Sequence, residues 1–274
     1  MTHQPDSVTR HYTVGGIMDK IESGLQQIGK DTDSITVDDL SAVDAFHTRG
    51  RESTVELATL AELQPQDRVL DVGCGLGGSA RFLANKYGCH VTALDLTPEY
   101  IEVATELSRL TDMQERTAFE TGDATALPFA DDTFDVVWTE HAQMNIADKD
   151  KFYAEIARVL RPGGRLVFHD IFAASGDPDF PVPWAEDASI SQLVSEDDAR
   201  HSIERSGLAI TLWDNKVAES IAWFETTLAK IQSSGPPPIG IHLLMGDTAR
   251  TKLANYLNGL NGGKLSVVIG VATK

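Results

Sequence analysis

The 274-residue sequence contains only two cysteines, Cys74 and Cys89. Two thiols cannot build a disulfide framework, and no CxxC pair or Cys/His cluster has the spacing of a zinc site. The sequence therefore predicts a protein of a reducing compartment, with the cytoplasm as the expected location, and no metal site.

Basic residues are also scarce. Lysine and arginine together number 23 against 41 aspartates and glutamates, so the formal net charge is −18. A negative field of this size repels phosphate backbones and anionic lipid surfaces, which argues against nucleic-acid and membrane partners. The acidity is typical of an ordinary soluble protein, and adaptation to high salt is the alternative explanation.

Long apolar runs are absent. The longest plausible stretch, 265–272, is far too short to span a bilayer. The first twelve residues are polar and lack the apolar segment of a secretory leader, so we expect no cleaved signal peptide.

From residue 67 onward, short β-branched runs alternate with segments of helical spacing. This order predicts an α/β fold in which helices cover both faces of a mostly parallel sheet. The predicted strands are 68–72, 90–94, 117–121, 134–138, 165–170, 209–213 and 265–272, and the predicted helices are 78–87, 98–110, 149–160 and 191–206.

Two segments flank or interrupt this pattern. Residues 1–64 are polar and helix-leaning, with a helix start at Thr36–Asp39 and an amphipathic helix at 52–63. Residues 215–264 hold two helical patterns, 217–232 and 241–260, split by a proline-rich connector. We therefore expect an N-terminal helical cap, 1–64, and one domain, 65–274, that includes a helical lid insertion, 215–264.

A glycine-rich turn follows the first predicted strand. Gly73, Gly75 and Gly77 allow the backbone to fold tightly and to approach a ligand closely. Taken alone the turn is ambiguous, because Gly73, Gly75 and Gly78 also fit the dinucleotide pattern, with Asp95 where a ribose-binding acid would lie.

Two acids help to separate the alternatives. Asp71 precedes the turn, where a carboxylate would repel a pyrophosphate but attract an ammonium group such as an amino-acid end. Asp123 follows the third predicted strand and can accept a hydrogen bond from an exocyclic amine such as that of adenine. Together they favour a ligand that carries a cation and a purine.

At this point the sequence resembles the class I S-adenosylmethionine-dependent methyltransferases. The matching segments are 71–77, 95–96, 122–124, 134–138 and 158–164. The resemblance implies a seven-stranded Rossmann-like sheet whose last strand is antiparallel, and S-adenosyl-L-methionine as cofactor.

The resemblance also implies the cofactor contacts. Asp71 and the backbone of the glycine turn, Gly73, Gly75 and Gly77, would hold the methionine part. Asp95 would bind the ribose hydroxyls, with Leu96 against the adenine, and Asp123 would bind the adenine amine, with Ala124 beside it. Paired hydroxyls suit a bidentate carboxylate, although Asp95 could instead cap the helix that starts at residue 98.

His141 and Asp170 are the catalytic candidates, because both lie near carboxyl ends of predicted parallel strands, where ligands bind. His141 could pack on the cofactor or act as a general base, and Asp170 could neutralise a substrate ammonium or orient a hydroxyl. Either residue could also be purely structural.

The segment 45–54 resembles the region ahead of the core in sarcosine/dimethylglycine methyltransferases. Arg51, or Arg49, could bind a carboxylate of cofactor or substrate, and either could be an ordinary surface arginine. Tyr12 and His47 are candidates to close over the cofactor. Aromatic residues such as Trp184 and Trp213 could hold a methylated ammonium or simply fill the core.

Three functions fit this sequence. The first is methylation of a small amine or amino acid such as sarcosine or dimethylglycine. The second is O-, N- or C-methylation of a natural product or quinone precursor. The third is a non-catalytic, cofactor-binding regulatory protein. The acceptor atom, the need for a base and the oligomeric state stay open.

Overall fold

The computed structural model describes residues 4–274, so the first three residues of the expected cap, and of the stretch expected to contain no signal peptide, lie outside the described part. Seven strands form one sheet in the order β3-β2-β1-β4-β5-β7-β6. β7 runs antiparallel to both of its neighbours, β5 and β6, and the other described strand pairs are parallel. This arrangement confirms the predicted fold class. The strands are β1 (Arg68–Val72), β2 (His90–Asp95), β3 (Thr117–Thr121), β4 (Phe134–Glu140), β5 (Leu160–Ala173), β6 (Ala209–Asn215) and β7 (Leu265–Thr273).

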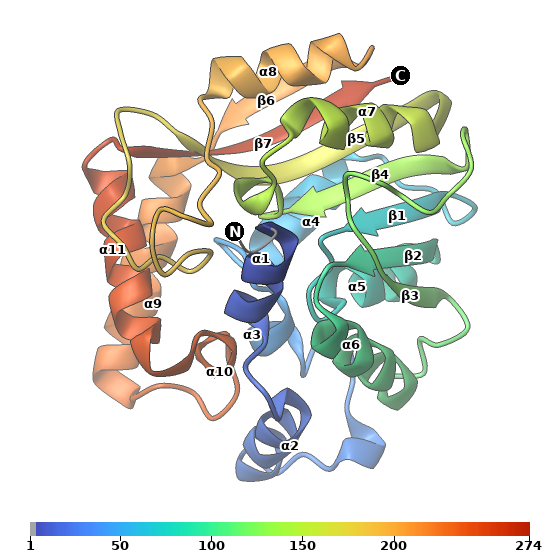
Figure 1. Ribbon diagram of the computed structural model, residues 1–274. Coiled ribbons are helices and arrows are strands. Elements are labelled where there is room, and N and C mark those ends of the chain that lie inside the picture. Colours follow the sequence, from blue (N-terminus) through green and yellow to red (C-terminus); the bar gives the residue numbers. More distant parts are fainter. Residues whose placement is uncertain (1–3) are drawn as a thin grey trace.

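Helices cover both faces of the sheet (Figure 1). On one face lie α4 (Arg51–Leu60) and α5 (Gly78–Tyr87), and α6 (Pro98–Leu110) packs along β2 and β3. On the other face α7 (Lys149–Val159) and α8 (Glu196–Arg205) pack together over β5 and β6. The helix predicted over 191–206 begins five residues later than expected, at Glu196. Ser195 is its N-cap residue, and the Ser195 side chain accepts a hydrogen bond from the Asp198 amide.

Strand alternation distributes the core between the two layers. Val69 packs beneath α4 and α5, whereas Leu70 and Val72 pack beneath α7 and α8. In β4 the same alternation places Trp138 in the core on the α4 and α5 side and Val137 in the core on the α7 and α8 side. Because β1 and β4 lie in the middle of the sheet and are buried on both faces, their polar residues at the carboxyl end are held rigidly.

The N-terminal segment contains α1 (Gln4–Tyr12), α2 (Ile17–Gln27), η1 (Thr32–Ser34) and α3 (Ser41–Asp44). The helix predicted to start at Thr36–Asp39 is absent. Thr36 and Asp39 do form the reciprocal bonds of a cap, with the Thr36 amide 2.9 Å from Asp39 Oδ2, but they close a turn. Helical structure begins only at Ser41 and lasts four residues.

The insertion contains α9 (Val217–Ser234), α10 (His242–Met245), η3 (Gly246–Thr248) and α11 (Ala249–Asn261). The single helix predicted over 241–260 is divided at Gly246, whose φ of 66° is left-handed. α9 and α11 pack against β7, and α10 contacts α2, so the insertion meets the N-terminal segment on one side of the sheet (Figure 1).

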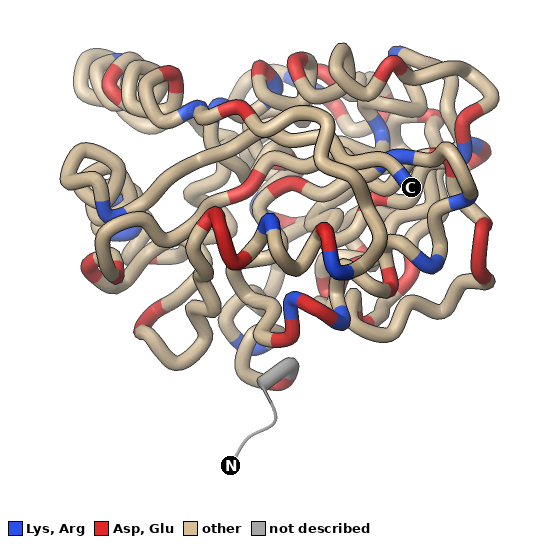
Figure 2. Tube along the Cα trace, turned by 90° about the horizontal axis from the view of Figure 1, so that it is seen from above, with Lys and Arg blue, Asp and Glu red and all other residues tan. Residues whose placement is uncertain are grey.

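Acidic positions lie along the whole trace, with Lys and Arg interspersed among them (Figure 2). Among residues 4–274, no helix combines the length and apolarity needed to cross a bilayer.

Candidate active site

A cavity of about 1170 Å³, open mouth included, lies at the carboxyl ends of β1, β2, β3 and β4. Loops after these strands form its floor, and α1, α3, the segment 183–184 and Tyr256 of α11 complete its walls. Eight of the predicted catalytic and cofactor-binding residues line it: Asp71, Gly73, Gly75, Asp95, Leu96, Asp123, Ala124 and His141.

The glycine turn is shaped by backbone conformation. Gly73 has φ 76°, and a Cβ there would fall 2.5 Å from the Cβ of Ala142. Gly75 has φ 53°, and its amide donates to Asp95 Oδ2 at 2.9 Å. Glycine is thus needed at residue 73 for two reasons, a left-handed φ and the close approach of the loop after β4.

Asp71, one residue before the end of β1, has a carboxylate that the surrounding residues leave incompletely satisfied. The residue is 2% exposed, and its Oδ2 atom is buried without a hydrogen-bond partner among the described residues. Burial raises the pKa of Asp71 well above its usual value, and the carboxylates of Glu140 and Asp95 add to the rise. A buried oxygen of this kind calls for a donor, and an ammonium group would supply one.

Asp95 and Asp123 each hold their loop and still face the cavity. Asp95 Oδ1 accepts from the Thr97 amide at 2.8 Å, and Thr97 occupies the N-cap position of α6 without a side-chain cap bond. Asp123 Oδ1 accepts from both the amide and the hydroxyl of Thr125 at 2.8 Å. Each carboxylate oxygen has two lone pairs, so both residues keep acceptor capacity for a ligand.

The charge of the lining is one-sided. Five carboxylates line the cavity: Asp44, Asp71, Asp95, Asp123 and Glu140. None of the described lining residues is a lysine or an arginine. Asp44 is paired with Arg81, and the other four carboxylates still favour a ligand that brings its own positive charge, as a sulfonium with an amino group does.

Three predicted site residues do not line the cavity. Gly77 starts α5, and a Cβ there would meet the ring of Phe119 at 2.5 Å, so this glycine serves packing between α5 and β3. The Arg51 guanidinium lies over the Phe82 ring, 3.8 Å from Asp44. It is therefore behind the cavity wall.

Asp170 is the third. Because β5 continues to Ala173, Asp170 lies inside the strand and not at its end. Its carboxylate accepts from the amides of Gln143 at 3.3 Å and of Ile171 at 3.1 Å, and Ile171 faces the cavity in its place. Burial raises the pKa of Asp170 to about 7.

His141 lies on the cavity wall in a constrained conformation. It has φ 52°, and its amide donates to the His169 carbonyl at 2.8 Å. The two imidazole rings are 4.8 Å apart, and His141 Nε2 is buried without a partner among the described residues. Burial, followed by the proximity of His47, lowers the pKa of His141 well below its usual value, so this imidazole is neutral at physiological pH and a weak base.

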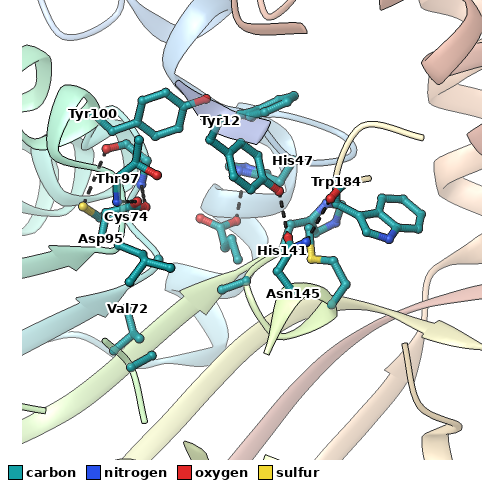
Figure 3. A pocket seen from close by; sticks show the side chains of 18 of the residues that line it. Tyr12, His47, Val72, Cys74, Asp95, Thr97, Tyr100, His141, Asn145 and Trp184 are labelled. Atoms are coloured by element: carbon teal, nitrogen blue, oxygen red, sulfur yellow. Dashed lines mark hydrogen bonds and ion pairs between the residues drawn. The ribbon is translucent and has the colours of Figure 1, made fainter. Parts of the chain in front are cut away.

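His47 reaches the cavity beside a carboxylate. Its Nε2 atom lies 3.2 Å from Glu140 Oε1. Glu140 in turn accepts from Ser79 Oγ at 2.5 Å and from Trp138 Nε1 at 3.0 Å. His47 was expected to close over the cofactor, and Figure 3 shows it between Asp95 on one side and Trp184 on the other.

The end of the cavity remote from Asp95 is apolar. Trp184 and Tyr256 meet edge to face at 5.4 Å, next to the side chains of Met144 and Ile171. Tyr12 of α1 covers this region and donates to Asn145 Oδ1 at 2.8 Å (Figure 3). Trp213, by contrast, packs against the core on the α7 and α8 side of the sheet, where Arg200 of α8 lies over its ring.

Sequence reasoning missed several lining residues, among them Asp44, Ser79, Tyr100 and Tyr256. Asp44 reaches the site because Arg81 of α5 binds it at 2.9 Å, and Tyr256 because its hydroxyl lies 2.7 Å from Thr48 Oγ1. These contacts join segments far apart in the chain, so no local motif reveals them.

Residues 70–168 match the family model described as "Methyltransferase domain". The match spans the strands and loops that form the floor of the cavity. This central part of the chain is therefore a methyltransferase domain.

Curated relatives share this central region. "Methyltransferase GfsG" of Streptomyces halstedii is 38% identical over 133 residues, which is 48% of each chain. The 2-methyl-6-phytyl-1,4-hydroquinone methyltransferase of Synechocystis is 36% identical over 61% of this chain and 55% of its own. The chain thus spans about half the length of these relatives. A glycine/sarcosine/dimethylglycine N-methyltransferase of Actinopolyspora halophila is 29% identical over 78% of this chain and 39% of its own.

A solved structure shows the same fold. Phosphoethanolamine N-methyltransferase 2 of Haemonchus contortus, in complex with S-adenosyl-L-methionine, superposes on all of this chain and 60% of its own with a TM-score of 0.76. The sequences are 19% identical, so this likeness concerns the fold.

Proposed function

We propose that this chain transfers the methyl group of S-adenosyl-L-methionine to an uncharged, largely apolar small molecule, of the natural-product or quinone-precursor kind. The observation that carries the proposal is the lining of the cavity, which has five carboxylates at one end, an aromatic wall at the other and no described lysine or arginine.

The carboxylate end suits the cofactor. The unpartnered Asp71 Oδ2 is available to the amino group of the methionine part, and the backbone at Gly73 and Gly75 leaves room for that part. Asp95 would take the ribose hydroxyls, and Asp123, with Leu96 and Ala124, the adenine. Bound there, the cofactor supplies an electrophilic methyl group on a sulfonium, whose positive charge matches the excess of carboxylates.

The aromatic end suits a neutral acceptor. A carboxylate or phosphate placed against Trp184, Tyr256 and Ile171 would lose its water without gaining a cationic partner, and an unpaired buried anion is costly. A neutral acceptor is therefore favoured over one of the sarcosine kind, which carries a carboxylate. The hydroquinone acceptor in the name of one relative is of the favoured class.

The proposal is tested with pairs of acceptors that share a ring system and differ in charge. A hydroquinone and a phenol are each compared with their carboxylated analogue, alongside sarcosine, dimethylglycine and phosphoethanolamine. Isotopically labelled cofactor and mass spectrometry report transfer. We expect the neutral member of each pair to react with the higher kcat/KM by at least about 10-fold, the equivalent of 1.4 kcal/mol.

Two results would contradict the proposal. Preferential methylation of the carboxylated members or of sarcosine would mean that the acceptor's anion finds a cation. Tight cofactor binding by calorimetry with no transfer to any acceptor would instead support the regulatory alternative.

A further inference from the structure

We propose that His47, oriented by Glu140, is the base that takes the proton from the methyl acceptor. This inference rests on the proposed function, because a base is needed only where the acceptor loses a proton. It assigns the role to a residue of the N-terminal segment instead of to His141.

The hydrogen bonds of His47 fix its tautomer. Its Nε2 atom lies 3.0 Å from the Gly50 carbonyl, 3.0 Å from Thr54 Oγ1 and 3.2 Å from Glu140 Oε1. The carbonyl and the carboxylate can only accept, so the proton of the neutral imidazole resides on Nε2. Nδ1 keeps its lone pair, and no described residue hydrogen-bonds to it.

Glu140 is itself held in place. Ser79 Oγ and Trp138 Nε1 both donate to Oε2, and the Thr54 hydroxyl lies 3.3 Å from both carboxylate oxygens. The residue is 8% exposed. A fixed, poorly hydrated carboxylate beside Nε2 stabilises the imidazolium that forms when Nδ1 gains a proton.

The other titratable groups around His47 do not compete with it. His141 follows β4 and His169 lies in β5, with ring centres 6.1 and 6.0 Å from that of His47. Burial lowers the pKa of both well below the usual value, so both stay neutral. Tyr256 of α11 has its pKa raised by burial and also stays neutral. Glu140 is therefore the charged group that lies in contact with the His47 ring.

His47 also lies where the two ends of the cavity meet. On its carboxylate side are Glu140 and Ser79, next to the glycine turn. On its aromatic side the neighbouring residue Thr48 binds the Tyr256 hydroxyl at 2.7 Å. His47 lies between Asp95 and Trp184 (Figure 3), so an acceptor that rests against the aromatic end and points toward the cofactor region would pass its reactive atom near this imidazole.

In the proposed step, the lone pair of the acceptor oxygen would form the new bond to the methyl carbon while the carbon–sulfur bond of the cofactor breaks. The two electrons of the carbon–sulfur bond would stay on sulfur, which becomes a neutral thioether. The acceptor's proton moves from oxygen to His47 Nδ1. The resulting imidazolium faces Glu140 and returns the proton to water after the product leaves.

The experiment uses three near-isosteric variants of the full chain. In His47→Gln the amide nitrogen replaces Nε2–H and keeps the bonds to Gly50 and Glu140, but the side chain cannot accept a proton. In Glu140→Gln the charge is lost with little change of shape. His141→Asn serves as the comparison, because asparagine tolerates the positive φ at residue 141.

Two measurements are made on each variant: kcat against pH with whichever acceptor the panel identifies, and the tautomer and titration of His47 by NMR on protein with labelled histidine. We expect His47→Gln to lower kcat by about 10²-fold or more and to abolish the acid limb of the pH profile. Cofactor affinity should change far less. Glu140→Gln should move that limb, and the NMR titration of His47, to lower pH. His141→Asn should keep the limb, whatever its effect on kcat.

Each of three results would overturn the inference. These are a His47→Gln enzyme with wild-type kcat and pH profile, a His47 proton found on Nδ1, or a His47 titration that Glu140→Gln leaves unmoved. The NMR measurements need no acceptor, so they decide the inference even if the panel yields none. An anionic acceptor would overturn the proposed function while leaving the test of His47 intact.

Discussion

The guanidinium of Arg81 lies 2.9 Å from the Asp44 carboxylate, and neither side chain is exposed to solvent. Arg81 also donates to the Ala104 carbonyl at 3.2 Å, so it links α3, α5 and α6. The pair packs so closely that a Cβ on Gly78 would meet the Asp44 carboxylate at 2.6 Å. Through this pair the N-terminal segment is fixed against the cofactor end of the cavity.

We expect Arg81→Met to destabilise the protein by about 3–5 kcal/mol, because it leaves the Asp44 carboxylate buried without a partner. Urea unfolding followed by circular dichroism measures the change. The matched control is Arg109→Met, since Arg109 binds Glu106 in a solvent-exposed pair on α6 and should leave the midpoint almost unchanged. The double variant Asp44→Asn/Arg81→Met should recover part of the loss. Equal midpoints for the two single variants would contradict the expectation.

Asp71→Asn should weaken cofactor binding while sparing the fold. Loss of a charge-assisted bond to the amino group corresponds to about 1.5–3 kcal/mol, or roughly 10- to 150-fold in the dissociation constant. The free protein should be as stable as before or more so, because the variant removes a buried carboxylate whose pKa is raised by burial. Calorimetry and thermal melts test both halves.

The same raised pKa gives a pH dependence. The ionised form of Asp71 is the one that attracts an ammonium group, so affinity for the cofactor should fall as the pH falls toward the raised pKa of Asp71. In Asp71→Asn this component should vanish. A wild-type affinity that is constant down to pH 5 would count against the contact.

Two glycine-to-alanine variants separate strain from contact. Gly73 and Gly163 have φ values of 76° and 79°, but only a Cβ at residue 73 meets a neighbour, Ala142, while the space around residue 163 is open. Both variants should lose about 1–2 kcal/mol of stability from left-handed backbone strain. Gly73→Ala should lose more and should also lose cofactor affinity. Equal effects on binding would place the cofactor away from this turn.

The stability of the protein should depend on pH through Asp170. Its pKa in the folded protein, about 7, exceeds the value near 4 expected when unfolded, so the folded state binds the proton more tightly. The free energy of unfolding should therefore decrease as the pH rises from about 4 to 7, by up to about 1.4 kcal/mol per pH unit from this group. Asp170→Asn should flatten this decline, and Asp150→Asn, a surface change on α7, should not.

Closure over the ligands should involve α1 more than the inserted helices. Val8 and Tyr12 of α1 line the cavity, whereas Tyr256 is the only described lining residue of 215–264. Hydrogen exchange should therefore slow in 4–12 and around residue 256 when cofactor binds, with little change in 217–234. Protection throughout the insertion would instead support the lid expected from the sequence, and α1 would lose its role if its exchange were unaffected.

The sheet could be read from the sequence because its strands are buried β-branched runs separated by glycine and proline. The cofactor end was readable for the same reason, since Asp71, Asp95 and Asp123 lie at or just beyond strand ends, where ligands bind. Their roles stay predictions. The position of Asp170 could not be predicted, because it depends on where β5 ends. β5 extends three residues beyond its predicted end, which turns Asp170 toward the Gln143 amide and away from the cavity.

The acceptor end could be predicted only in part. Trp184 and Tyr12 were named as candidates, but Tyr256 was not, because the three residues come from distant segments that meet only in the folded chain. No local periodicity distinguishes a cavity wall from ordinary core. His47 was identified as a candidate, but its relation to Glu140 depends on how α4 packs on the sheet.

The position of β7 between β5 and β6 has a consequence for synthesis on the ribosome. β6 pairs with no described strand other than β7, yet α9, α10 and α11 are all translated between the two. The nascent chain therefore carries β6 and one edge of β5 without a partner until residues 265–273 emerge. Unpaired strand edges invite intermolecular pairing, so this interval is when aggregation competes with folding and when chaperones have most to contribute.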